Sequence, residues 1–141
     1  MKCKIISLIL FTMITFTSTA FAAQWAYVCK SSDNMQSMYV DRDTAAKIDD
    51  TVIFWELVVL YEPDPTGVKK FLYKKQANKQ HMERQLEEYD YKSNNELHWT
   101  DIVASNWSSY FSGTIEECIV NAAFKFAKEG KDSGQKPPLR N

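Results

Sequence analysis

Acidic side chains are the groups in this chain that could do acid–base chemistry. Glu56 is the single acid inside an otherwise apolar segment, a setting that raises a carboxyl pKa. The run Glu87-Glu88-Tyr89-Asp90 gathers further carboxylates. No G-x-S-x-G motif is present, and nothing beside Cys29 activates it as a nucleophile. We therefore favour a paired or edge-facing Glu56 and predict no catalytic residue, with a hydrolase that uses these acids as a weaker alternative.

Metal binding is the second chemistry to consider. The chain has two histidines, His81 and His98, and neither belongs to an H-x-x-x-H or H-E-x-x-H pattern. A site would need carboxylates such as Glu83 or Asp101 to be brought to them by folding. We interpret both histidines as strand-surface residues and predict neither a metal nor a cofactor.

Basic residues interleaved with aromatic ones suggest nucleic-acid binding in some proteins. Here Lys69-Lys70 and Lys74-Lys75 alternate with Phe71 and Tyr73. The chain carries 17 Lys and Arg against 18 Asp and Glu, so no basic field exists to hold a phosphate backbone. The sequence predicts a solvated strand face and no nucleic-acid partner.

Aromatic side chains are a better indication of function. Four tryptophans and seven tyrosines exceed what one small core requires, and amphipathic rings often anchor recognition surfaces. Trp107, Tyr110 and Phe111 fall in an irregular stretch before a predicted helix. Our hypothesis is that these three rings form an exposed patch for a partner, and the alternative is a loop folded over the sheet.

The first 22 residues have the pattern of a secretory signal peptide. Lys2 and Lys4 precede an apolar run from residue 5 to residue 16, which is too short to cross a bilayer stably, and small residues follow at Ala20 and Ala22. We predict cleavage after Ala22 and a periplasmic or secreted product. No later apolar run approaches the roughly 20 residues of a spanning helix, so no membrane span is predicted in the mature chain.

The cysteines are interpreted in the light of export. Cys3 would leave with the signal peptide, and Cys29 and Cys118 would remain. An even pair in an oxidising compartment favours one disulfide, which closes a loop of about 90 residues and stabilises the fold by about 4 kcal/mol. Two buried free thiols are the alternative.

Alternating residues predict a fold made mostly of strands. The segment 51–61 is apolar on both faces, which indicates a central strand covered on both sides. The segment 81–91 also fits a helix, but its neighbours favour a strand. A single helical turn is predicted after Asp41-Arg42-Asp43-Thr44. The other predicted strands are 24–30, 38–40, 68–77 and 97–104.

One longer helix is predicted near the end of the chain. Thr114 and Glu117 have the spacing of a capping box, and an apolar stripe follows them until Gly130 can stop the helix. The fold class is therefore α+β, a mainly antiparallel sheet with a C-terminal helix packed on it. We predict one domain over residues 23–128 and a flexible tail over residues 129–141.

Several short motifs resemble the surface-adhesin protein E family of secreted bacterial domains, over about residues 24–126. The motifs are Trp25, Tyr39-Val40-Asp41 with Thr44, Val52-Ile53-Phe54-Trp55 with Tyr61, Gly67 before a Lys-rich strand, Arg84 and Leu86 before Tyr89, and Trp107 before Ser112-Gly113-Thr114.

This resemblance implies one α+β domain and a non-enzymatic role, since the family is named after members that bind host extracellular proteins. Members tend to carry cysteines near Asn78 or Lys79 and near Phe124 to Phe126, where this chain has other residues. The lipid anchor of a surface-displayed member is also missing. We expect an exported binding protein for a host or envelope protein or a small ligand. The alternative is a periplasmic structural or stress-linked envelope protein.

Overall fold

Most of the chain forms β-strands, as the alternation of its side chains predicts. The computed structural model describes residues 23–130 and 136–139, so the predicted signal peptide and its cleavage site at Ala22 lie outside the described residues. The strands within residues 23–130 are β1 (Trp25–Lys30), β2 (Gln36–Asp41), β3 (Ala46–Ile48), β4 (Thr51–Leu60), β5 (Val68–Asn78), β6 (Met82–Lys92), β7 (Leu97–Asp101), β8 (Ser108–Ser109) and β9 (Lys128–Glu129).

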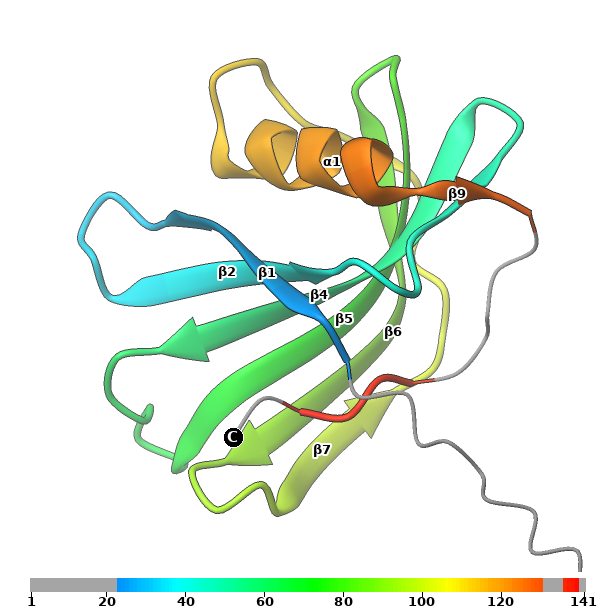
Figure 1. Ribbon diagram of the computed structural model, residues 1–141. Helices are drawn as coiled ribbons and strands as arrows, with labels where there is room; N and C mark the ends of the chain where they lie inside the picture. Colours follow the sequence, from blue (N-terminus) through cyan, green and yellow to red (C-terminus); the bar gives the residue numbers. More distant parts are fainter. Residues whose placement is uncertain (1–22, 131–135, 140–141) are drawn as a thin grey trace, which may run out of the picture.

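One antiparallel sheet with the order β1-β2-β4-β5-β6-β7 is the framework of the fold. The short strands attach to it: β3 pairs with β4, β8 pairs with β6, and β9 pairs with β3 in parallel. One helix, α1 (Ile115–Phe126), lies across one face of the sheet (Figure 1). The predicted fold class, a mainly antiparallel sheet with a C-terminal helix packed on it, is confirmed.

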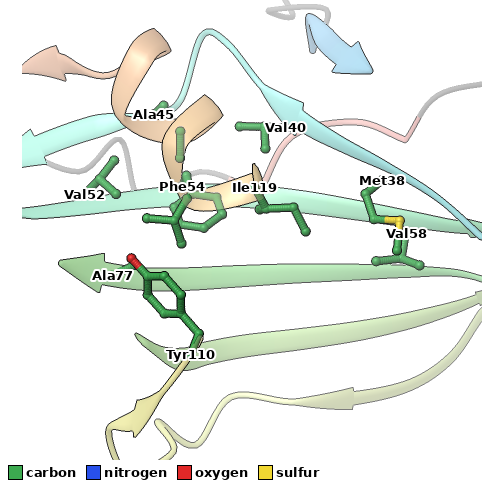
Figure 2. Packing of buried hydrophobic residues seen from close by; sticks show 11 residues of the cluster. Met38, Val40, Ala45, Val52, Phe54, Val58, Ala77, Tyr110 and Ile119 are labelled. Atoms are coloured by element: carbon green, nitrogen blue, oxygen red, sulfur yellow. The ribbon is translucent and has the colours of Figure 1, made fainter. Parts of the chain in front are cut away.

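Strand β4 is buried on both faces, as its two apolar rows predict. On the helix side Val52 and Phe54 are fully buried, and Figure 2 shows Phe54 close to Ile119 of α1. On the other face Trp55 and Leu57 are equally buried, within a second cluster. The fold therefore has two small cores that share one central strand.

Helix α1 begins where the capping box predicts. The backbone N–H of Glu117 donates to the Thr114 hydroxyl at 3.4 Å, and the Glu117 carboxylate accepts from the Gly113 N–H at 2.7 Å. The first contact satisfies an amide that the first helical turn leaves without a partner, and the second ties the residue before the cap to the helix. The side chains of Ile119 and Ala123 then enter the core on the helix side.

The predicted helical turn after Asp41 is wrong. The buried Asp41 carboxylate accepts the backbone N–H groups of Gln24 and Asp43 and the hydroxyl of Thr44, so it organises a turn and ties down the start of β1. An aspartate whose carboxylate serves several local donors favours a turn over a helix. The chain then continues directly into β3.

The end of the chain is more structured than predicted. The helix ends at Phe126 and not at Gly130, and β9 extends the sheet beyond the predicted domain boundary at residue 128. Lys47 and Glu129 form an ion pair of 2.9 Å between β3 and β9. Residues 136–139, part of the predicted flexible tail, contact the sheet face that α1 leaves uncovered.

The cysteines predicted to form a disulfide lie on two neighbouring elements. Cys29 is in β1 and Cys118 is in α1, and these elements are in contact. Both thiols are free in the structure. Burial raises the pKa of the Cys29 thiol, and the nearby Cys118 raises it further. The fold therefore brings the thiols into the same region, and the disulfide stays a prediction.

We expect protein isolated from an oxidising compartment without reductant to contain a Cys29–Cys118 disulfide. Peptide mapping by mass spectrometry, before and after reduction, would detect the cross-linked peptides. Reduction should lower the free energy of unfolding by up to about 4 kcal/mol, because the open chain gains entropy when it unfolds. A Cys29→Ser variant should show no response to reductant. Complete alkylation of both thiols in the unreduced protein would contradict this prediction.

Candidate protein-binding surface

Apolar side chains are exposed along β7 and the segment that follows it. We call these residues the β7 surface. Two of them, Leu97 and Trp99, lie in β7, and the others lie between β7 and α1. Large apolar side chains exposed in one segment of a chain mark candidate contact surfaces. The members of the β7 surface are Leu97, Trp99, Ile102, Val103, Trp107 and Phe111.

The backbone of β7 adds a second feature to this surface. Strand β7 is the last strand in the sheet order, and within residues 23–130 it pairs only with β6. Four of its five residues are exposed. An edge strand presents N–H and C=O groups that can pair with another strand. The β7 surface thus combines open backbone groups with apolar side chains.

Two of the three predicted patch residues belong to this surface. Phe111 is 74% exposed. Trp107 is 38% exposed, and the guanidinium of Arg84 lies 4.9 Å from the centre of its indole ring. Gln76 fixes that guanidinium by accepting from Nε and Nη2 at 3.0 and 2.7 Å. Trp107 is therefore held in place while one side of its ring stays accessible.

The prediction for Tyr110 is wrong, because this residue is only 7% exposed. Its ring belongs to the core on the helix side and stacks on His81, with 5.0 Å between ring centres. Its hydroxyl donates to the Asn78 carbonyl at 3.0 Å. Residues 102–109 and Phe111 are exposed, whereas Tyr110 points into the core (Figure 2 shows Tyr110).

Glu56 is buried on the helix side of the sheet and is paired, as the favoured interpretation states. The Lys75 ammonium lies 2.8 Å from its carboxylate and 3.8 Å from that of Glu83. Burial lowers the pKa of Lys75, but the two carboxylates outweigh that effect, so its pKa is raised. Burial also raises the pKa of Glu83. Both Lys74 and Lys75 were predicted to be solvated. Lys74 is instead buried and Lys75 is half-buried, each in an ion pair.

The acidic run of β6 is divided between the two faces of the sheet. Glu87 lies 3.5 Å from Lys74 and accepts the Tyr89 hydroxyl, whereas Glu88 accepts from Gln85. Burial, followed by repulsion from Glu88, raises the pKa of Asp90 to about 6. The run therefore serves two separate networks and does not form one acidic site.

A cavity of about 260 Å³ lies between α1 and the turn that joins β5 to β6. Its polar groups come from Lys79, His81, Glu117 and Asn121, and Glu56 does not line it. No local pattern of residues predicts this cavity, because its lining comes from three separate segments. The second histidine, His98, lies exposed in β7, away from this lining.

Among residues 23–130 and 136–139, no group of three or more His, Cys, Asp and Glu side chains is placed to hold a metal ion. The same residues contain no helix with the length and apolar character needed to cross a membrane. Comparison with protein-family models, with curated proteins and with solved structures found no match. The β7 surface therefore has to be interpreted from its own chemistry.

Replacing Lys75 by Met should lower the free energy of unfolding by about 3 kcal/mol, because Glu56 would remain buried without its partner. Chemical denaturation would measure the change. The double variant Glu56→Gln with Lys75→Met should recover part of the loss. Lys47→Met, which removes an exposed pair with Glu129, should change stability far less. Equal effects of the two lysine substitutions would contradict this account of the buried pair.

Asp90→Asn should raise the melting temperature at pH 7 by a few degrees. The pKa of Asp90 is about 6 in the folded state and about 4 in the unfolded state. Between these two pH values the folded protein therefore binds a proton at Asp90 that the unfolded chain does not. The ionised Asp90 therefore destabilises the wild-type fold at neutral pH, and the advantage of the variant should shrink towards pH 4.5. Thermal unfolding at several pH values would test this.

The matched control is Asp49→Asn, in an exposed turn where the positive φ of 52° suits asparagine. Its effect on the melting temperature should be small at every pH. If Asp90→Asn behaved in the same way as this control, the interpretation of Asp90 would be wrong.

Proposed function

We propose that this chain is an exported, non-enzymatic binding protein that takes a protein partner on the β7 surface. The observation that supports this most strongly is the set of large apolar side chains exposed on the edge strand β7 and on the segment that follows it. Burying such side chains against a partner is favourable by about 25 cal/mol for each Å² of apolar surface removed from water. A soluble protein that bound nothing there would gain nothing from this exposure.

The proposed mode of binding is addition of a strand from the partner to β7. The open backbone groups of the edge would supply hydrogen bonds, and side chains such as Trp99 and Val103 would supply apolar contacts. The backbone pairing gives affinity for any extended segment, while the side chains select apolar ones. Trp107, held by Arg84, offers a pre-organised ring at the margin of the surface.

Three further observations support the proposal. The basic, apolar and small-residue pattern of residues 1–22 supports export. The resemblance to the surface-adhesin protein E family favours binding to a host extracellular protein over catalysis. The Glu56 carboxylate is paired with the Lys75 ammonium, which favours a binding role over acid–base chemistry for this chain. Host matrix proteins and envelope proteins are the candidate partners.

Val103→Lys and Phe111→Ser should each weaken partner binding about tenfold or more, because each removes an apolar contact from the interface. The measurement is a titration of immobilised protein with purified host matrix proteins and with periplasmic extract. Saturable binding to a matrix protein supports a host partner. Saturable binding to an envelope protein alone supports the periplasmic alternative.

The matched control is Tyr61→Ser, which removes an aromatic ring that is 72% exposed but lies outside the β7 surface. It should bind as the wild-type protein does. The proposal fails if Tyr61→Ser weakens binding as much as Phe111→Ser, or if no partner from either source binds saturably.

A further inference from the structure

The sheet face opposite α1 carries a second set of aromatic side chains, separate from the β7 surface. Trp55 and Tyr91 are buried there beside Leu57 and Leu72. Further rings at the margin of this cluster come from β1, β2 and β6. We call the whole set the aromatic face; its rings are Trp25, Tyr39, Trp55, Tyr89 and Tyr91.

The chain's own segment Lys136-Pro137-Pro138-Leu139 lies on this aromatic face. The indole N–H of Trp25 donates to the Pro138 carbonyl at 3.0 Å. Pro137 is buried, and Leu139 packs against the cluster around Trp55. In Figure 1 the segment, drawn in red, passes beside the start of β1.

Lys136 fixes one end of the segment through two tyrosines. Its ammonium donates to the Tyr91 hydroxyl at 2.6 Å and lies 4.4 Å from the centre of the Tyr89 ring. A cation over an aromatic ring is attracted by the negative face of that ring. The position of the lysine therefore sets the direction in which the segment crosses the face.

These contacts are those by which proteins recognise proline-rich peptides. Two successive prolines hold φ near about −65° and keep the preceding residue extended, so such a segment loses little conformational entropy when it binds. Aromatic side chains accept the proline rings, and a donor such as the Trp25 indole pairs with a carbonyl that the extended chain leaves open. The aromatic face supplies the indole donor and buries Pro137 beneath the segment's exposed residues.

The segment is attached by contacts that can be exchanged. Lys136 and Pro138 are exposed, and no residue of 136–139 pairs with a strand. The hydrogen bond from Trp25 is itself exposed to solvent. A competing peptide with the same groups could therefore replace the segment and cover the cluster around Trp55 in its place.

We propose that the aromatic face is a binding site for proline-rich extended peptides of the type Lys-Pro-Pro-apolar from another protein, and that residues 136–139 occupy it as an internal competitor. The site is distinct from the β7 surface, so it adds a second partner class to the proposed function. The internal segment is present at a high effective concentration, which keeps binding of an outside peptide weak until the segment is displaced.

The test uses the full chain and a fluorescent peptide with the sequence of residues 135–140, followed by anisotropy. The variant Pro137→Ser with Pro138→Ser removes the internal competitor, so it should bind the peptide about tenfold or more tightly than the wild-type chain. A peptide in which both prolines are replaced by serine should not bind. Equal, weak binding of the peptide to the variant and to the wild-type chain would overturn the proposal.

Trp25→Phe, placed in the same variant, keeps an aromatic ring but removes the indole donor. It should weaken peptide binding about fivefold, the effect of one neutral hydrogen bond. Circular dichroism would verify that each variant folds. If the proline variant did not fold, Leu139→Ser would weaken the internal segment instead, because Leu139 packs against the cluster around Trp55. Peptide binding no tighter than that of the wild-type chain would then overturn the proposal.

Two controls separate this site from its alternatives. Phe111→Ser should leave peptide binding unchanged, so that failure of the β7 surface and failure of the aromatic face are distinguishable. Size-exclusion chromatography with light scattering would show whether two copies exchange their segments. Suppose that the wild-type chain is a dimer, that the proline substitutions convert it to a monomer, and that this monomer binds no peptide. That result would overturn the proposal in favour of exchange of segments between copies.

Discussion

Burial of β4 on both faces is the constraint on which the rest of this structure depends. A strand with Phe54 on one face and Trp55 on the other needs apolar cover on two sides, because exposure of either row would cost most of the free energy that folding gains there. Helix α1 supplies one cover. The other comes from side chains that pack around Trp55, among them Tyr89 of β6 and Leu139 near the end of the chain.

The same constraint decides where charge can be placed. Glu56 lies in the middle of β4, and the fold tolerates it because β5 brings Lys75 beside it. Once both faces are covered, the edges of the sheet remain for contacts with other molecules. Strand β7 has exposed apolar side chains at such an edge. The aromatic face is covered by the short segment 136–139, which is bound through exposed contacts such as the Trp25 hydrogen bond. Recognition is therefore proposed at these two places.

Local signals in the sequence were enough to predict most of the framework. Alternation located the main strands, and the capping residue Thr114 located the start of α1. The failures arose where tertiary contacts decide the structure. Asp41 forms a turn because the start of the described chain, at Gln24, supplies a donor. Tyr110 is buried because the Asn78 carbonyl at the end of β5 accepts its hydroxyl and the His81 ring stacks on it. Residues 136–139 had no apolar periodicity, so nothing local indicated their contacts.

Solution NMR of the full chain gives the most direct test of the claim that both faces of β4 are covered. The account predicts nuclear Overhauser contacts between the Leu139 methyl groups and the side chains around Trp55, beside the contacts of Ile119 with Phe54 on the helix side. Random-coil shifts for Leu139 and no contact to that cluster, with the Ile119 contacts intact, would contradict it.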